Sequence, residues 1–588
     1  MPRARQWRCP GRRCHRRFTG LAYPQAMPVP VDAPRLHPRP SGDPSADPLA
    51  AGPASGRPEL RAGLQAGLLA AGPALLILVA AHTLTGSPGF LEALADGLTF
   101  LPIQVVGAAI ATFGPLAKGL VYLGIGLGFL ALGAVVGVVL DPRLPRPGDS
   151  GLALAIALGL LAIAEVAVLP LFQAGLLGSA TGFDPIALHA PLALACLAYG
   201  MAFLALRGPA RASPERSPAG PGAARSGVAR PAGGSAMPRR TFLGQSLGLI
   251  GGLSVLAAFG TMGSQVITAA RSRTGGRVAG FPADSFGPTP ALTPVDDFYI
   301  VAKDLITPTV AADSWRLLID GLVDRPTSVS LATLQAIPAV EAYRTLECIS
   351  TEIVAGDHLI GNQHWRGVRI ADLLAPVGVQ PAATAILWEA ADGYTESIPL
   401  QVALDPDSWI AYEMGDAPLP PEHGAPARVL IAGRFGMKQP KWVTRMHLAA
   451  TVPQGYWEER GWDEQAIVRT MSRIDFPLPG DTVPVGSAFR AYGIANAGDR
   501  GVRAVQISAD GGTTWQAAQL DDVHAAPFGP LSWILWRADV TVAEAGPARL
   551  VVRAIDGTGA VQSGDETSAL PSGSTGWHAV RVLATPGA

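Results

Sequence analysis

The stretch Tyr343-Arg-Thr-Leu-Glu-Cys348-Ile-Ser carries the only cysteine that follows Cys196 in the chain. Its residues are apolar and β-prone, and the same character continues into Gly361-Asn-Gln-His-Trp-Arg-Gly367. A lone thiol in this part of the chain cannot form an intramolecular disulfide. Three roles therefore stay open for Cys348: inert core packing, nucleophilic catalysis and coordination of a soft metal.

A second stretch combines positive charge with glycine. The residues Arg428-Val-Leu-Ile-Ala-Gly433-Arg-Phe-Gly436-Met-Lys438-Gln-Pro-Lys441-Trp442 place four cations and two glycines after an apolar run. Glycine lets backbone amides approach a ligand closely, while lysine and arginine form charge-assisted hydrogen bonds with phosphate. This stretch therefore predicts a site for a cofactor that carries phosphate.

Composition limits the class of protein. At 588 residues, the chain is long enough for several domains. Only 15% of its residues are charged, its formal net charge is −1, and its mean hydropathy is +0.28. This balance predicts a membrane portion in contact with lipid and no nucleic-acid partner.

Long apolar segments predict helices that cross a bilayer, because about 20 helical residues span its hydrocarbon core. There are four such segments, at residues 63–84, 119–140, 151–176 and 186–206, and they define a membrane domain at 63–206. The segment 97–117 is also apolar, but its prolines and the lysine beside it suit an interfacial or re-entrant helix at least as well.

The placement of arginine predicts the orientation of these spans. Seven arginines and one glutamate lie between Arg207 and Arg240, so the linker at 207–238 is expected in the cytoplasm. The N-terminal residues 1–62 are rich in Arg, Pro, Ala and Gly, and we expect them to be disordered and cytoplasmic. An even number of spans must then separate the two segments, and four fits this condition.

Residues 239–263 are predicted to be a fifth span that leads outward. They begin with Arg239-Arg240-Thr-Phe-Leu243, which resembles the twin-arginine export motif, and continue as an apolar run. The alternative is that two arginines merely anchor the cytoplasmic end of a helix. Under either interpretation, the chain is a multi-pass protein of the cell membrane whose remaining domains lie outside the cytoplasm.

The rest of the chain divides near residue 450. Residues 264–450 mix strand-like runs, such as 315–320, with helical ones, such as 370–374, and this mixture is typical of an α+β domain. Residues 451–588 are strand and turn throughout, which predicts an all-β domain.

A series of short motifs resembles the molybdopterin-binding oxidoreductase family, which includes sulfite oxidase and the catalytic subunits of periplasmic methionine sulfoxide reductases. The resemblance covers residues from about 290 to 580 and rests on the order and spacing of the motifs together. It implies a sulfite-oxidase-type molybdopterin domain, followed by an immunoglobulin-like domain through which two copies form a homodimer. The motifs are Thr293-Pro-Val-Asp-Asp-Phe-Tyr299, Ile319-Asp-Gly-Leu-Val323, Leu346-Glu-Cys348, Trp365-Arg-Gly-Val368, Asp392-Gly-Tyr394, Ala411-Tyr-Glu-Met414, Pro418-Leu-Pro-Pro-Glu-His423-Gly and Gly436-Met-Lys438.

The same resemblance implies the site residues. Cys348 matches the cysteine whose thiolate binds molybdenum beside the dithiolene sulfurs of the pterin, and soft sulfur ligation suits this metal. Tyr456 lies where the family has an active-site tyrosine, although packing at the domain junction is the other role open to it. The expected cofactor-binding residues are Phe298, Tyr299, Cys348, Asp392, His423, Arg428, Arg434, Gly436, Met437, Lys438 and Lys441. For Asp392, Arg434 and Lys441, ordinary surface or turn roles stay open.

The implied activity is two-electron oxygen-atom transfer on a small substrate, with an unidentified electron-transfer partner. Val301 and Glu352 stand where sulfite oxidases carry arginines, and the sulfite dianion needs cations around it. Lys303 or Arg344 could replace those arginines. The direction stays open between oxidation of a small oxyanion and reduction of a sulfoxide or N-oxide, but we predict that sulfite is turned over poorly and that a neutral sulfoxide or N-oxide is handled better. Outside the enzymes, the alternative is a membrane-tethered binding protein with a metal-free version of the fold.

The predicted spans contain three ionisable residues, His82, Glu165 and His189. The two histidines lie near the outer ends of their spans, which raises the hypothesis of a haem b with two histidine ligands or of a quinone site. Only one pair of histidines is present and no helix carries two. Interfacial histidines and a hydrogen-bonded glutamate are therefore the favoured interpretation.

Overall fold

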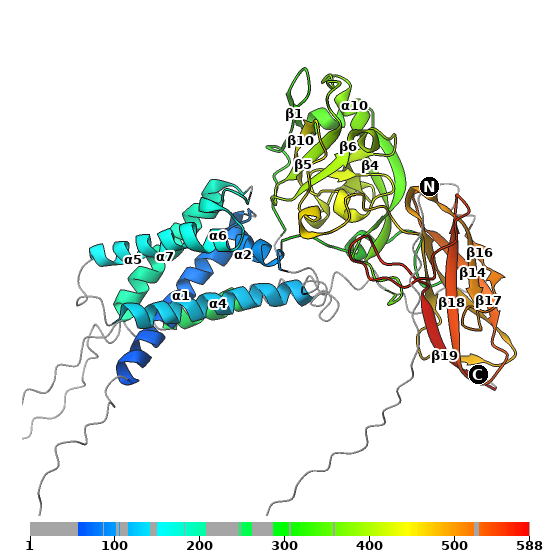
Figure 1. Cartoon of the computed structure of the whole chain (residues 1–588), viewed down its shortest axis with the longest axis horizontal. Helices are drawn as coiled ribbons and strands as arrows, with labels where there is room; N and C mark the ends of the chain where they lie inside the picture. The colour runs from blue at the N-terminus through cyan, green and yellow to red at the C-terminus, as the bar shows by residue number, and fades with distance from the viewer. Residues whose placement is uncertain are drawn as a thin grey trace, which may run out of the picture. The chain divides into compact units, whose positions relative to one another are not determined.

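The computed structural model describes residues 57–85, 87–101, 105, 116–141, 150–181, 183–206, 246, 249–260, 286–304, 307–356, 359–521 and 528–586 (Figure 1). Residues 1–56, the predicted cytoplasmic linker and the arginine pair of the export motif lie outside this part of the chain. Along the sequence, the described elements are first helical, then mixed, and finally all β.

Four described helical stretches are long and apolar enough to cross a membrane, in agreement with the four predicted spans. They are Leu60–Thr85, Gly119–Leu140, Gly151–Leu171 and Pro185–Leu206. The helical elements are α1 (Arg57–Thr85), α2 (Phe90–Leu98), α4 (Leu116–Leu140), α5 (Ser150–Ile163), the π-helix η1 (Ala164–Val168), α6 (Leu169–Leu171), η2 (Leu176–Gly178) and α7 (Pro185–Leu206).

Glycines allow α1 and α4 to approach closely. A Cβ on Gly67 would lie 2.3 Å from the carbonyl oxygen of Gly133, and a Cβ on Gly137 would lie 2.3 Å from that of Gly63. Small residues at helix contacts are typical of helices that associate in a bilayer. The hydroxyl of Tyr199 on α7 donates to the Gly133 carbonyl at 2.6 Å, so α7 joins the same packed bundle.

The third span is shorter than predicted. It ends at Leu171 instead of residue 176, because Gln173 and Gly175 have φ values of 61° and 76° that no α-helix accommodates. The helix α2 was not predicted from the sequence. This helix has only nine residues, too few for its apolar side to stand out from the neighbouring spans.

The predicted fifth span is only partly described. Within 239–263 the structure describes the apolar helix Leu249–Gly260, which is shorter than a bilayer crossing requires. Most of the residues on either side of it lie outside the described part, so this span stays a prediction.

The α+β part contains two sheets, in strand orders β2-β1-β10-β5-β6 and β3-β4-β7-β8, with β9 paired to β7 (Figure 1). Leu317, Trp388 and Met446 from the first sheet share one buried core with Val368 and Ile410 from the second. The elements are η3 (Val295–Asp297), β1 (Arg316–Gly321), β2 (Thr327–Ser330), α9 (Leu331–Gln335), β3 (Val340–Glu347), β4 (Ile360–Arg369), α10 (Ile370–Leu374), β5 (Ala385–Ala390), β6 (Thr395–Pro399), α11 (Leu400–Ala403), β7 (Trp409–Met414), β8 (Ala417–Pro418), η4 (Pro421–His423), β9 (Arg428–Leu430), η5 (Gly436–Lys438) and β10 (Val443–Ala449).

The C-terminal part is all β, as predicted. Its two sheets, in strand orders β11-β13-β17-β16 and β12-β19-β18-β14-β15, enclose a core that includes Trp536 from one sheet and Val552 from the other. Its elements are η6 (Glu458–Arg460), β11 (Met471–Phe476), β12 (Thr482–Pro484), β13 (Ala488–Asn496), η7 (Gly498–Arg500), β14 (Val502–Ser508), β15 (Gln516–Ala517), β16 (Gln519–Leu520), β17 (Ile534–Thr541), β18 (Gly546–Asp556) and β19 (Ala579–Thr585).

Candidate functional site

Cys348 lies directly after β3, where β3 and β4 separate. Glu347 is the last residue of β3 and pairs with Ile360, and the next backbone N–H, that of Cys348, donates to the Leu359 carbonyl at 2.9 Å. The side chain is buried, and its Sγ lies 3.0 Å from the hydroxyl oxygen of Ser350. The end of the β-ladder therefore holds the thiol in a defined position, as a metal ligand requires.

Arg428 is the residue best suited to bind a buried anion. Its Nη1 and Nη2 donate to the carbonyls of His423 and Gln439, at 3.2 and 3.3 Å, and its Nε has no hydrogen-bond partner among the described residues. Arg344 is also buried with an unpaired Nε, but it has the carboxylate of Asp407 beside it. Burial lowers the pKa of Arg428 to about 10, so the side chain stays protonated at neutral pH.

A buried charge without a counterion is costly, and an unpaired donor adds to that cost. Arg428 forms no ion pair with any carboxylate in the described part of the chain. An anion bound there would supply both the missing charge and an acceptor for Nε. Arg428 thus fits the phosphate of the molybdopterin that the sequence implies.

Aromatic rings line the region beside Arg428. The Phe298 ring meets the His423 ring edge to face, with centroids 5.4 Å apart, and stacks on Tyr299 at 5.3 Å. Burial lowers the pKa of His423 to about 3, and the charges of Lys441 and Arg428 add to this effect. His423 is therefore neutral at physiological pH, and its ring already forms a hydrogen bond with the Val295 backbone.

The short helix η5 brings the predicted loop to the same place. A Cβ on Gly436 would lie 3.1 Å from the hydroxyl oxygen of Tyr299, so glycine lets the backbone approach this ring. Met437 is buried in a cluster that contains Ile349, the residue after Cys348. The structure thus brings together Cys348, Tyr299 and the loop that were predicted as parts of one site.

The ammonium of Lys438 is engaged elsewhere. It donates to Glu396 Oε1 at 2.7 Å, to Glu458 Oε1 and to the Ser397 carbonyl at 3.3 Å. These three bonds use all three of its hydrogens. A contribution of Lys438 to cofactor binding, as predicted from sequence, would fall to its backbone.

Asp392, Lys441 and Arg434, for which ordinary surface or turn roles stayed open, differ in their burial and in their contacts. Asp392 is buried and accepts the Tyr394 backbone N–H at 3.0 Å, so it stabilises the turn between β5 and β6. Lys441 donates to the Glu422 carbonyl at 2.8 Å and lies over the Trp442 ring. Arg434 is only partly buried. Their predicted contacts with a cofactor stay predictions.

Among the described residues, the hydroxyl of Tyr456 forms no hydrogen bond with another residue predicted for the site. The hydroxyl donates to Asp96 Oδ1 at 2.8 Å and lies 3.4 Å from the Thr99 hydroxyl. Trp457 and Trp462 instead pack on the buried cluster that contains Ile349. These two tryptophans were not among the residues predicted for the site, although their aromatic spacing beside Tyr456 was a usable signal.

The residues considered for an oxyanion pocket are also engaged elsewhere. Lys303 lies 2.9 Å from Asp96 Oδ2 and 2.9 Å from Asp304 Oδ1. Glu352 accepts the Ala569 backbone N–H at 3.0 Å. Neither Lys303 nor Arg344, which is paired with Asp407, therefore offers an uncompensated charge to a substrate.

Each histidine of the predicted spans lies beside a carboxylate. His82 Nδ1 is 3.1 Å from Glu92 Oε1, and His189 Nδ1 is 2.7 Å from Glu165 Oε1. The π-helical turn η1 carries Glu165 and directs it to α7. Each histidine thus contacts a different glutamate. The described structure therefore gives no support to a haem held between the two histidines.

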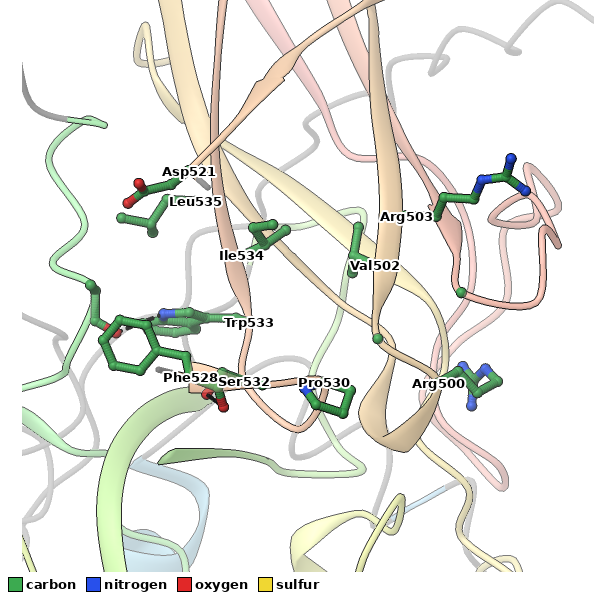
Figure 2. A pocket seen from close by; sticks show the side chains of 14 residues that line it. Arg500, Val502, Arg503, Asp521, Phe528, Pro530, Ser532, Trp533, Ile534 and Leu535 are labelled. Carbon is green, nitrogen blue, oxygen red and sulfur yellow. Dashed lines mark hydrogen bonds between the residues drawn. The ribbon is translucent and has the colours of Figure 1, made fainter. Parts of the chain in front are cut away.

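A separate pocket of about 330 Å³ is lined by Ala291 and otherwise by residues of the C-terminal part, and none of its lining residues is among those predicted for the site (Figure 2). Trp533, which lines it, donates its backbone N–H to Thr345 Oγ1 at 2.7 Å. Arg500 is already bonded to Asp556 at 2.9 Å. The pocket therefore adds nothing to the site around Cys348.

Comparison with known proteins matches both domains. Residues 304–457 match the oxidoreductase molybdopterin binding domain, and residues 466–585 match the Mo-co oxidoreductase dimerisation domain. The two matched domains are those of molybdopterin-dependent oxidoreductases, and this part of the chain is similar to sulfite oxidases, so the cofactor that it implies is molybdenum bound to molybdopterin.

Two relatives illustrate the similarity. Mitochondrial sulfite oxidase of Drosophila melanogaster is 31% identical over 46% of this chain and 55% of its own, and that of Macaca fascicularis is 30% identical over 50% and 62%. The chain thus spans about 55 to 62% of the length of these relatives. In the sulfane dehydrogenase SoxCD from Paracoccus pantotrophus, a chain with 23% identity superposes with a TM-score of 0.42 over 48% of this chain and 79% of its own.

Proposed function

We propose that this protein is a membrane-anchored molybdopterin oxidoreductase that catalyses two-electron oxygen-atom transfer on a small substrate outside the cytoplasm. The buried guanidinium of Arg428, which lacks a counterion and has an unpaired Nε, carries this proposal. It is explained by a phosphate-bearing cofactor, and the buried thiol of Cys348 supplies the soft ligand for its metal.

The roles of the residues follow from their chemistry. The bound cofactor supplies a metal that exchanges an oxygen atom and two electrons with the substrate. Cys348 would hold the metal through its thiolate, and Arg428 and the backbone around Gly436 would hold the phosphate. Neutral His423 adds no charge to an already cationic region.

The preferred substrate is a neutral sulfoxide or N-oxide. Lys303 and Arg344 are paired with carboxylates, and Val301 provides no charge. If Arg428 holds the cofactor phosphate, neither Lys303 nor Arg344 offers a free charge to the substrate, and this favours a neutral ligand over a dianion such as sulfite. Oxidation of a small oxyanion is the opposite direction of the same chemistry, and it is the second candidate because the relatives are sulfite oxidases.

The proposed setting is the outer face of the cell membrane. Four apolar helices support membrane anchoring, and the arginines of the linker support the outward orientation of the catalytic domain. The match of residues 466–585 to a dimerisation domain supports a homodimer through an immunoglobulin-like sandwich. The electron-transfer partner is a separate, unidentified component.

Metal analysis of the purified full-length chain tests the proposal directly. We expect about one molybdenum per chain, and we expect Cys348→Ser to abolish turnover and change the molybdenum EPR signal while the protein stays folded. A protein without molybdenum would instead be the metal-free binding protein. Full activity with an unchanged EPR signal in the serine variant would refute the role of Cys348.

A further inference from the structure

A buried cluster of charges lies beside the cofactor loop. The ammonium of Lys438, on η5, is bonded to the carboxylates of Glu396 on β6 and Glu458 on η6. All three side chains are buried, with 2%, 0% and 6% of the surface of Lys438, Glu396 and Glu458 exposed. Two carboxylates and one ammonium leave one negative charge without compensation in the protein interior if both acids are ionised.

The hydrogen bonds of Tyr394 indicate where a neutralising proton resides. Its hydroxyl oxygen lies 2.7 Å from the Met437 carbonyl oxygen and 3.1 Å from Glu396 Oε2. A hydroxyl has one hydrogen, and the carbonyl can only accept. If the hydroxyl donates to Met437, Glu396 Oε2 must carry its own hydrogen in order to donate to Tyr394.

The other oxygen of Glu396 is fully used as an acceptor. Oε1 accepts from Lys438 and from the Ser397 backbone N–H at 2.7 Å, whereas Oε2 meets only the Tyr394 hydroxyl among these groups. Burial raises the pKa of Glu396 to about 8, despite the opposing effect of Lys438, and the charge of Glu458 raises it further. Asp392 is the remaining charged group that acts on Tyr394 from the same turn.

We propose that a proton held by Glu396 controls the hydrogen bond from Tyr394 to the cofactor loop. With the proton present, Glu396 donates to Tyr394, and Tyr394 donates to Met437. When the proton leaves, the carboxylate of Glu396 becomes the stronger acceptor and takes the Tyr394 hydrogen. Met437 then loses its donor, and the loop around η5 loosens.

Glu396 and Tyr394 are positioning residues in this scheme, because they act on the cofactor through the loop Gly436–Lys438. The functional consequence rests on the proposed function, but the loop movement does not. An inert salt-bridge cluster would hold the loop equally at every pH. If hydrogen exchange of the loop depends on pH in the wild type and this dependence disappears in Glu396→Gln, the cluster controls the loop and is not an inert salt bridge.

Hydrogen–deuterium exchange of the full-length protein tests the loop directly. We expect the peptide covering 433–441 to exchange up to about tenfold faster at about pH 9 than at about pH 6.5, after correction for intrinsic exchange, because it has lost one hydrogen bond. Glu396→Gln places an amide N–H where the protonated acid was, so its loop should stay protected at both pH values.

Tyr394→Phe removes the link and should give a loosened loop at both pH values. Glu389→Gln is the matched control, because Glu389 is a half-exposed glutamate on the adjacent strand β5 and pairs with Arg445 outside this cluster. It should retain the pH response of the wild type. Equal pH responses in the wild type and Glu396→Gln, or a wild-type response in Tyr394→Phe, would overturn the proposal.

Turnover provides an independent measurement. In the wild type, kcat with a sulfoxide and a reduced viologen dye should fall on the alkaline side as the loop loosens, and Glu396→Gln should remove that fall while KM changes little. An alkaline fall that persists in Glu396→Gln would contradict the control by Glu396. Absence of turnover in all proteins would count against the proposed function alone, since the exchange experiment needs no substrate.

Discussion

The guanidinium carbon of Arg344 lies 3.5 Å from the centre of the Trp409 ring, and its Nη2 lies 3.4 Å from Asp407 Oδ1. The cation is thus held by stacking on one side and by a carboxylate on the other. Arg344 belongs to β3, the strand that ends next to Cys348, so it was the nearest cation in sequence that could have served an oxyanion. Its charge is instead used within the protein.

The first prediction concerns substrate preference. Because Arg344 and Lys303 are paired with acids, sulfite with an artificial acceptor should give a kcat/KM far below about 10⁶ M⁻¹s⁻¹, a value typical of efficient enzymes. Sulfoxides or N-oxides with a reduced viologen dye should be turned over better. Steady-state kinetics with both substrate types measures this.

Val301→Arg provides a matched gain of function, since it restores an arginine of the sulfite oxidase pattern at a residue with 38% exposure. It should raise sulfite kcat/KM and leave sulfoxide reduction nearly unchanged. Efficient sulfite oxidation by the unaltered protein would reverse the proposed preference.

The second prediction concerns Arg428. Arg428→Gln removes the charge and should weaken retention of the cofactor about 10- to 100-fold, because a hydrogen bond to a charged group contributes about 1.5 to 3 kcal/mol. Arg428→Lys should retain part of the binding, since it keeps the charge but loses the fork of donors. Molybdenum content per chain and pterin fluorescence after denaturation report the loss.

Arg369→Gln serves as the control, because Arg369 is a 44%-exposed arginine on β4. It should keep a full complement of molybdenum. Normal molybdenum content in Arg428→Gln would show that another group binds the phosphate.

Several features of the site were predictable because they depend on local sequence. The β-prone run before Cys348 becomes β3, and the positive, glycine-containing stretch after Arg428 becomes a loop that reaches Tyr299. The length of the apolar segments predicted the four apolar helices for the same reason. Each of these features is encoded by residues that are neighbours in the chain.

The partners of charged residues were not predictable. Glu396 and Glu458 are separated from Lys438 by 42 and 20 positions, and nothing in their surroundings distinguishes them from exposed glutamates. The sequence therefore suggested a phosphate contact for Lys438, whereas the fold gives its ammonium two carboxylates. The same limitation applies to Tyr456, whose hydroxyl partner Asp96 is 360 positions away.

The third prediction concerns export. If the twin-arginine machinery reads this motif, the double substitution of Arg239 and Arg240 by lysine should leave the catalytic domain on the cytoplasmic side, because lysine keeps the charge but not the guanidinium pair. Protease digestion of spheroplasts should then spare the domain, whereas it should cleave the domain of the unaltered protein. Equal digestion of both proteins would favour a simple helix anchor.

The last prediction concerns stability and pH. In the folded protein the pKa of Glu396 is about 8, whereas an exposed glutamate has a pKa near 4.5. Between these values the folded state keeps a proton that the unfolded state releases, so stability must fall as pH rises through this window. The fall contributed by Glu396 is at most about 1.4 kcal/mol per pH unit.

Glu396→Gln cannot release this proton, so it should lose less stability than the wild type between about pH 5.5 and about pH 8. Chemical denaturation of the full-length protein and the variant across this range measures the difference. Asp510 and Asp556 have pKa values lowered by hydrogen bonds, so they titrate below this window and cancel in the comparison. Parallel stability curves for the two proteins would show that Glu396 is already ionised in the fold, and the proton assigned to it would then be absent.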